Sequence, residues 1–215
     1  MKILIAIPCM DTVPVPFAEC LLNLDKPEGT KVCFKPSSLI YDARNLLSLK
    51  AIQDEFDYVM WFDSDMVFPH DTLTRLLKDL DEYHARIASG LYFKRYLPTA
   101  PVIYQVLDEP KKNERGMLVR QLETYDDYPK DSKFLIHGAG FGCMLTHTSV
   151  LKQVWDTFGP AFAPLPWGGE DISFCYRVKQ LGIYMYCDSS IKCGHIGQFQ
   201  YTEKIFDMTR GEAND

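Results

Sequence analysis

Residues 58–69 of the chain read YVMWFDSDMVFP. The first five of them are aromatic, β-branched or otherwise apolar without alternation, which is typical of a strand buried on both faces of a sheet. Asp63, Ser64 and Asp65 follow directly, at the position where open α/β sheets bind their ligands. Two carboxylates this close repel each other when both are ionised, and a divalent cation relieves the repulsion. The stretch therefore predicts a site for a metal and a phosphate ester at a sheet edge.

The composition of the whole chain limits the classes of function. Its 215 residues suit one domain with a sizeable core. The formal net charge of −6 argues against a sequence-independent nucleic-acid binder, which needs a basic surface. An anionic substrate would therefore need local help from a metal ion or a few arginines.

Cysteine usage and the N-terminus bear on the compartment. The seven cysteines are an odd number without paired spacing, which predicts free thiols in a reducing compartment and makes a zinc site improbable. The apolar run at residues 3–7 is too short for a signal peptide or a membrane span. We therefore expect a cytoplasmic protein without an integral membrane segment.

The order of predicted elements sets the fold class. Strands are expected at residues 2–7, 31–34, 58–62 and 86–89, and helices at 17–24, 41–56 and from Pro69 onward. This alternation predicts a mainly parallel central sheet flanked by helices. Further strands without intervening helices predict a small antiparallel extension, at 102–106, 117–122, 134–137, 143–146, 184–187 and 191–193. Two later helices are expected, one capped by Thr148 and one beginning at Glu170, and the chain after Tyr201 is expected to be a polar tail that is frayed or continues into a longer protein.

Several short motifs occur in a fixed order along these elements. Ala43-Arg44-Asn45 lies on the long helix, Phe62-Asp63-Ser64-Asp65 ends the quoted strand, and Gly138–Gly142 forms a glycine-rich turn. Gly169-Glu170-Asp171 precedes a helix, and Gly194-His195 comes late. A lone Asp-x-Asp is weak, but the ordered set resembles the GT-A-fold glycosyltransferases, in particular their compact, inverting, family-2-like members. The resemblance covers the chain short of its tail and implies a single GT-A domain.

The resemblance assigns a divalent metal to this edge. Asp65 would coordinate an ion that bridges the two phosphates of a nucleotide-sugar, and Asp63 would hold the ribose or contact the ion through water. His195 would be a third protein ligand, and its nitrogen favours Mn²⁺ over Mg²⁺. The plainer alternatives are an acidic cap before the Pro69 helix and a partly exposed histidine in a glycine turn.

The same resemblance assigns the catalytic base. Asp171 would deprotonate the acceptor hydroxyl, with Glu170 as its orienting partner or as the base itself. Acidic residues in a first helical turn also have a purely structural explanation. Arg44 would contact the base or the diphosphate of the donor, or it is an ordinary solvated arginine.

The remaining assignments are binding residues. The loop after the first strand and the metal motif are expected to line the donor site, through Pro8, Cys9, Met10, Asp11, Arg44, Asp63, Ser64 and Asp65. The glycine turn and the later loop are expected to contact the sugar or acceptor, through Gly140, Phe141, Gly142, Trp167 and Gly169. A strand and not a helix follows the glycine turn, so a dinucleotide cofactor is not expected. Lys94 and Arg95 could bind an acceptor or a phosphate, or belong to an ordinary surface loop.

The sequence thus predicts a metal-dependent inverting glycosyltransferase that uses a nucleotide-sugar, with UDP-sugar favoured, and a hydroxyl acceptor such as a glycan. Residues 1–105 would form the nucleotide-sugar-binding half, residues 106–200 the acceptor and catalytic half, and residues 201–215 the tail. A sugar-phosphate nucleotidyltransferase and a non-catalytic nucleotide-sugar-binding module are the alternatives. The first normally has a glycine-rich basic loop after its first strand, where this chain has Pro8-Cys9-Met10-Asp11.

Overall fold

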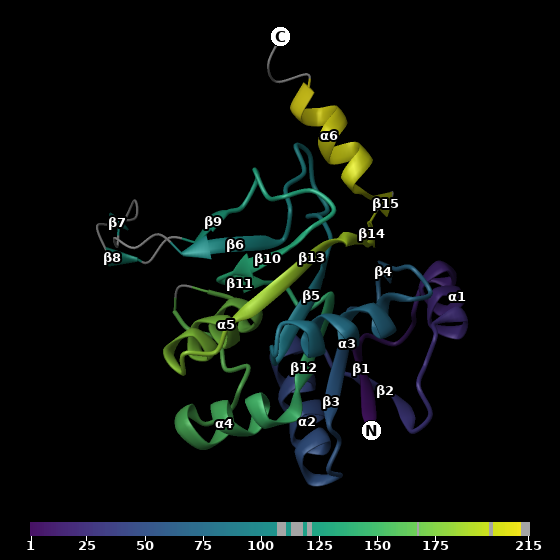
Figure 1. Ribbon diagram of the computed structural model, residues 1–215, viewed down its shortest axis with the longest axis vertical. Coiled ribbons are helices and arrows are strands. Elements are labelled where there is room, and N and C mark those ends of the chain that lie inside the picture. Colours follow the sequence, from purple (N-terminus) through teal and green to yellow (C-terminus); the bar gives the residue numbers. More distant parts are fainter. Residues whose placement is uncertain (107–110, 113–117, 120–121, 167, 198–199, 212–215) are drawn as a thin grey trace.

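A computed structural model describes residues 1–106, 111–112, 118–119, 122–166, 168–197 and 200–211 (Figure 1). The helices are α1 (Val15–Asn23), α2 (Ile40–Gln53), α3 (Thr72–Glu82), α4 (Thr148–Phe158), α5 (Glu170–Gln180) and α6 (Glu203–Gly211). The central sheet contains β1 (Ile3–Cys9), β2 (Thr30–Pro36), β3 (Tyr58–Phe62), β5 (Ile87–Leu91), β10 (Lys133–Ile136), β12 (Cys143–His147) and β13 (Met185–Lys192). Short strands form smaller sheets: β4 (Met66–Val67), β6 (Ile103–Val106), β7 (Lys111–Lys112), β8 (Leu118–Val119), β9 (Leu122–Thr124), β11 (Gly138–Ala139), β14 (Gly194–Ile196) and β15 (Gln200–Tyr201).

The central sheet has the strand order β10-β13-β5-β12-β3-β1-β2. β1 pairs in parallel with β2 and β3, and β13 pairs in parallel with β5. β12 runs antiparallel to both β3 and β5, and β10 runs antiparallel to β13. β1, β2, β3, β5 and β13 therefore point in one direction. The prediction of an α/β fold with a mainly parallel sheet and small antiparallel additions is confirmed.

Both faces of the sheet are buried, which explains why its strands lack alternation in sequence. Leu4 and Ala6 of β1 belong to the core under α2, α4 and α5. Ile3, Ile5 and Ile7 of the same strand belong to the second core, under α1 and α3. The result is three layers, with the sheet between two sets of helices (Figure 1).

A small sheet joins the quoted stretch to the late part of the chain. β4 follows Asp65 directly and pairs antiparallel with β14, so that Met66 lies opposite His195. The amide of Ile196 donates to the Asp65 carbonyl at 2.8 Å. This pairing fixes the backbone of Asp65 against that of His195.

Four elements differ from the sequence predictions. α3 begins at Thr72, whose amide and hydroxyl both donate to the Pro69 carbonyl, so Pro69 precedes the helix. His147, not Thr148, caps α4, because its ring nitrogen accepts from the Ser149 amide at 3.1 Å. The two strands expected at 184–193 are one strand, β13, with a register shift. The expected polar tail contains α6, which buries Phe206.

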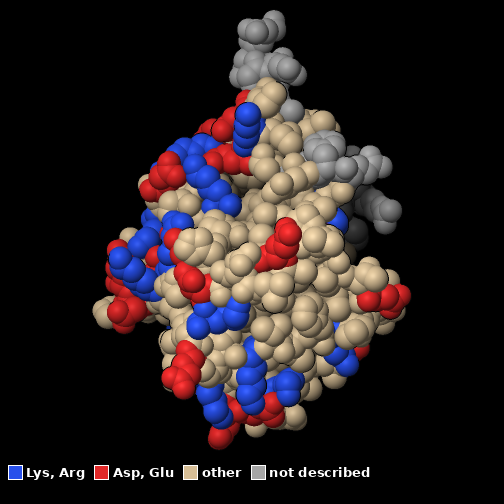
Figure 2. Space-filling view, turned by 90° about the vertical axis from the view of Figure 1, so that its right-hand side faces the viewer, with Lys and Arg blue, Asp and Glu red and all other residues tan. Residues whose placement is uncertain are grey.

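The surface, the helices and the cysteines give three further observations. On the face drawn in Figure 2, acidic and basic side chains are interspersed and are not gathered by sign. No helix within the described ranges is both long enough and apolar enough to cross a membrane. All seven cysteines are free thiols, and four of them are buried.

Candidate active site

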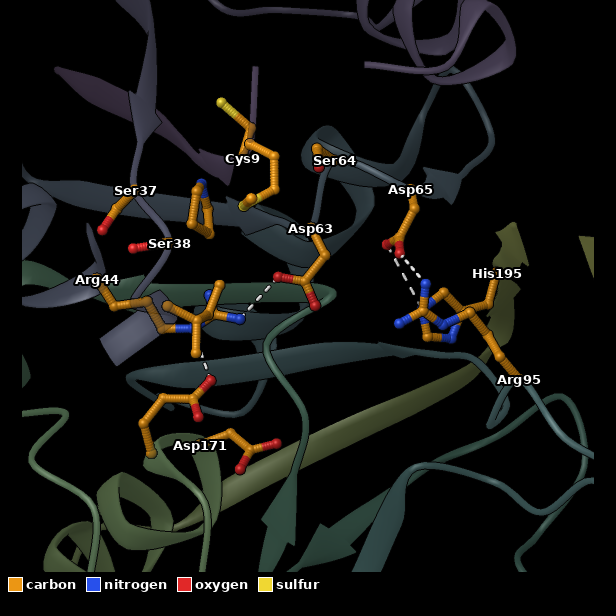
Figure 3. Close-up of a pocket in the computed structure, with 14 residues that line it drawn as sticks. Cys9, Ser37, Ser38, Arg44, Asp63, Ser64, Asp65, Arg95, Asp171 and His195 are labelled. Atoms are coloured by element: carbon orange, nitrogen blue, oxygen red, sulfur yellow. Dashed lines mark hydrogen bonds and ion pairs between the residues drawn. The ribbon is translucent and has the colours of Figure 1, made fainter. Parts of the chain in front are cut away.

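A cavity of 320 Å³ opens at the edge where β1 and β3 end (Figure 3). Its lining comes from the ends of both strands, the loop after β2, α2, the segment after β5, the start of α5, and β14. The lining residues are Pro8, Cys9, Met10, Ser37, Ser38, Ile40, Arg44, Asp63, Ser64, Asp65, Arg95, Glu170, Asp171 and His195. Residues predicted separately as donor, metal and catalytic residues therefore meet in one place, within the volume range of small-molecule sites.

Asp63 is held by an arginine from α2. Arg44 Nη2 lies 2.7 Å from Asp63 Oδ1, and Arg44 Nε lies 3.3 Å from Glu170 Oε1 at the start of α5. The Asp63 amide donates to the Gly142 carbonyl at 3.3 Å, which anchors the turn to β12. Arg44 thus ties the end of β3 to the start of α5.

The Arg44 guanidinium is itself buried. Its side chain is 3% exposed, and its guanidinium carbon lies 5.3 Å from the ring centre of Phe141 and 5.9 Å from that of Trp61. Burial alone would lower the pKa of Arg44, but the carboxylates of Asp63, Glu170 and Asp171 outweigh it and raise the pKa. Arg44 therefore stays charged, and its contacts are those of a residue that positions Asp63 and Glu170.

Asp65 faces a different set of partners. Its Oδ1 lies 3.5 Å from His195 Nε2, and its Oδ2 lies 2.5 Å from Arg95 Nη1. Burial acts to raise the pKa of Asp65, but His195 and Arg95 together bring it below its usual value. The carboxylate is therefore ionised at neutral pH.

The Asp65 and His195 pair fits a divalent ion. His195 Nδ1 lies 2.8 Å from the Phe93 carbonyl, which can only accept, so Nδ1 carries a proton and Nε2 is the nitrogen that faces Asp65. Asp65 Oδ1 is buried without a hydrogen-bond partner. Metal-ligating histidines commonly donate their other ring N–H to a backbone carbonyl, as His195 does to Phe93.

The predicted three-residue metal set is not gathered. Within the described ranges, no group of three His, Cys, Asp or Glu side chains is placed to hold an ion. Asp63 Oδ1 is engaged by Arg44. Asp65 and His195 face each other, and Asp63 lies with them in the cavity lining.

Asp171 occupies the first turn of α5, next to Glu170. Burial and the neighbouring Glu170 charge raise the pKa of Asp171 to about 6. Its Oδ1 accepts from the amide of Ile172 at 2.7 Å. A carboxylate whose pKa lies this close to neutrality, at the wall of a cavity, is suited to accept a proton.

Gly140 and Gly142 make room for Tyr92. A Cβ on Gly140 would lie 1.9 Å from the Tyr92 hydroxyl oxygen, which accepts from the Gly142 amide at 3.2 Å. Phe141 is 1% exposed and packs edge-on against Phe162. These positions differ from the prediction that Gly140, Phe141 and Gly142 contact the sugar or acceptor, because all three lie outside the cavity lining.

Two other predicted binding residues, Asp11 and Gly169, also lie outside the cavity lining. Asp11 is exposed beyond the lining, and Gly169 is the N-cap residue of α5. Trp167 lies outside the described residues. Sequence reasoning missed Ser37, Ser38 and Ile40, which follow β2 and have no motif of their own, and it left Arg95 undecided. The parallel pairing of β1 with β2 is the signal that could have placed Ser37 beside Cys9, whose carbonyl accepts from the Ser37 amide at 3.1 Å.

Comparison with solved structures finds the same architecture elsewhere. A197 from STIV matches over 92% of this chain and 86% of its own, with 19% identity and a TM-score of 0.65. GalNAc-T7, solved with UDP, GalNAc and Mn²⁺, matches over 93% of this chain and 44% of its own, with 11% identity and a TM-score of 0.59. At these identities the similarity is one of fold.

Comparison by sequence gives a family. The family model described as Glycosyl transferase family 2 matches residues 16–155. That range includes Arg44 and the Asp63-Ser64-Asp65 motif and ends before α5. No curated protein matches the chain.

Proposed function

The chain belongs to glycosyl transferase family 2 and has the GT-A fold of a glycosyltransferase. We propose that it transfers a sugar from a nucleotide-diphosphate sugar to a hydroxyl group, in a metal-dependent reaction that inverts the anomeric centre. The main support is the cavity itself, in which Asp65 and His195 lie at one end and Asp171 at the other (Figure 3). We favour a UDP-sugar as donor, because GalNAc-T7, which shares the fold, was solved with UDP. The acceptor would be a glycan or another molecule with a free hydroxyl.

Asp171 is the proposed general base. Its carboxylate takes the proton of the acceptor hydroxyl while the hydroxyl oxygen bonds to the anomeric carbon. The bond from that carbon to the phosphate oxygen breaks, and the nucleoside diphosphate leaves with its electron pair. A single displacement of this kind inverts the anomeric centre. Glu170, the proposed partner of Asp171, is held by Arg44, and its neighbouring charge helps to raise the pKa of Asp171.

Asp65 and His195 are the proposed protein ligands of the ion. A divalent cation supplies positive charge that stabilises the leaving diphosphate, and the nitrogen of His195 favours Mn²⁺ over Mg²⁺. Asp63 would then accept from the ribose or from a metal-bound water through Oδ2, since Oδ1 is held by Arg44. Pro8, Cys9 and Met10 would line the nucleoside pocket.

The proposal extends to the organisation of the chain. The nucleotide-sugar half would comprise residues 1–105 and the acceptor and catalytic half residues 106–200. Free thiols on all seven cysteines support a cytoplasmic protein, because that compartment keeps thiols reduced.

Binding and product assays test the proposal together. Calorimetry with a panel of nucleotide-sugars plus Mn²⁺ identifies the donor, and a product assay with candidate acceptors measures transfer. Asp65→Ala or chelation with EDTA should lower transfer about 100-fold or more, given the several kcal/mol a metal contributes to such reactions. Asp25→Ala is the matched control, since Asp25 is exposed and pairs only with His70 among the contacts described.

Two results would contradict the proposal. Full transfer activity in EDTA would show that the reaction does not require a metal ion. Donor binding without turnover on any acceptor would indicate a nucleotide-sugar-binding module.

A further inference from the structure

Arg95 lies on a short loop that is fixed at its base. Phe93 bridges to Pro101, and the Lys94 amide donates to the Ala100 carbonyl at 2.9 Å. The Thr99 hydroxyl closes the loop further by donating to the Lys94 carbonyl at 2.7 Å. The backbone next to Arg95 is therefore held, and its long side chain is the part free to change position.

The Arg95 side chain reaches the cavity from the same side as His195 (Figure 3). Both of its described contacts use Nη1, at 2.5 Å to Asp65 Oδ2 and at 3.5 Å to the Ile196 carbonyl. The side chain is 50% exposed, against 3% for Arg44. A guanidinium has five N–H donors, so this arrangement leaves donors of Arg95 directed at the cavity or at solvent.

The charges around the cavity single out Arg95. Among the described lining residues, four are carboxylates, namely Asp63, Asp65, Glu170 and Asp171, and the lysines and arginines are represented by Arg44 and Arg95 alone. Arg44 is buried and already bonded to two of the carboxylates. A diphosphate entering this cavity would meet Arg95 as the one exposed arginine in that lining.

We infer that Arg95 exchanges partners during the catalytic cycle, pairing with Asp65 before the donor arrives and with the donor's diphosphate oxygens once Asp65 has turned to the metal. The inference rests on the proposed function and adds a diphosphate ligand to it. Arginine suits this task because its planar fork binds phosphate with two parallel hydrogen bonds.

The exchange makes an unusual prediction about binding. Arg95 and the metal compete for Asp65 when no donor is present, so Arg95 weakens metal binding. With the donor present, Arg95 pairs with the diphosphate and strengthens binding of the donor. Removal of Arg95 should therefore change the two affinities in opposite directions, which a merely structural residue would not do.

The experiment uses the full chain with Mn²⁺ and UDP as probes. Mn²⁺ binding alone is followed by the electron paramagnetic resonance of the free ion, and UDP binding is followed by calorimetry at saturating Mn²⁺. Arg95→Met should bind Mn²⁺ alone about 2- to 5-fold more tightly, the value of an exposed ion pair. It should bind UDP with Mn²⁺ about 10- to 100-fold more weakly, the value of charged hydrogen bonds. Arg95→Lys should fall between wild type and Arg95→Met for UDP.

Lys94→Met is the matched control, because it removes the same charge from the same loop. Lys94 lies over the rings of Tyr96 and Tyr104 and is not part of the cavity lining. Its affinities should equal those of the wild type.

The outcomes separate this inference from the proposed function. Suppose that wild type binds UDP with Mn²⁺, and that Arg95→Met binds Mn²⁺ and UDP either as tightly as wild type does or both more weakly than wild type does. The proposed exchange of partners by Arg95 is then wrong, and the proposed function stands. If wild type binds neither UDP, with or without Mn²⁺, nor any other nucleoside diphosphate, both the proposed function and the inference about Arg95 are wrong.

Discussion

The Asp63-Ser64-Asp65 motif makes two arginine–aspartate pairs of similar length that differ in the burial of the arginine. We call Arg44–Asp63 the buried pair and Arg95–Asp65 the exposed pair. The buried pair has a separation of 2.7 Å, with Arg44 3% exposed among aromatic rings. The exposed pair has a separation of 2.5 Å, with Arg95 50% exposed on a loop.

The difference shows how one motif can serve two purposes. A buried ion pair is costly to break, because either partner alone leaves an uncompensated charge. An exposed pair contributes little, because water replaces each partner at small cost. Asp63 is thus fixed as a part of the framework, and Asp65 remains available to another cation.

The largest effect should come from Asp171, which adjoins the buried pair. Asp171→Asn should lower transfer about 10²- to 10⁴-fold, the contribution of a general base. Binding of UDP with Mn²⁺ should stay within about 2-fold of wild type, because Asp171 is not among the proposed contacts to the donor. Steady-state kinetics with calorimetry checks both. Equal transfer by wild type and Asp171→Asn would shift the base to Glu170.

The next largest effect should be on stability, when the buried pair is broken. Arg44→Met should lower the free energy of unfolding by about 3–5 kcal/mol, because Asp63 and Glu170 lose the charge that compensates them. Urea denaturation at neutral pH measures it. The double variant Arg44→Met with Asp63→Asn should recover part of the loss, and a double variant less stable than Arg44→Met would contradict this explanation.

Asp171, next to the buried pair, should also make the stability of the fold depend on pH, with a smaller effect than that of Arg44→Met. The folded pKa of Asp171, about 6, exceeds the ordinary value of 3.8, so the unfolded chain loses its proton first. The free energy of unfolding therefore falls as pH rises from about 4 to about 6, because Asp171 ionises in the unfolded chain before it does in the folded chain. The fall is on the order of 1–3 kcal/mol. Asp171→Asn should be more stable than wild type at pH 7.5 and equal to it below pH 3.5. Urea denaturation at the two pH values tests the sign.

The smallest effect should be at the exposed pair. Arg95→Met should change the free energy of unfolding by less than about 1 kcal/mol, because the pair is half solvated. The change should shrink further at high salt, which screens exposed charges. If Arg95→Met lowered the free energy of unfolding as much as Arg44→Met does, the two pairs would contribute equally to stability, contrary to this prediction.

The sequence was most informative where burial is uniform. The apolar runs at residues 3–7 and 58–62 predict strands correctly, because strands covered on both faces need no alternation. The carboxyl ends of those strands then locate Pro8, Asp63 and Asp65 at one edge. Sheet geometry converts these local patterns into a shared site.

The sequence was least informative where the partner is distant and unpatterned. The space beside Gly140 is filled by Tyr92, far upstream, so the glycines could not be told from a ligand loop. Helix α6 looks polar, yet one residue, Phe206, packs on Phe93 and Tyr128. Arg95 carries no motif, and its importance arises from contact with Asp65.

The strand order has a consequence for how this protein is made. β13 lies between β5 and β10, although the ribosome synthesises it after both. Until residues 185–192 emerge, β5 has an open edge of unpaired amides and carbonyls, and β10 lacks its neighbour in the sheet. β10 and one edge of β5 must therefore wait, unpaired on that side, until this late strand is inserted between them. During that interval the nascent chain is open to edge-to-edge association and to capture by chaperones.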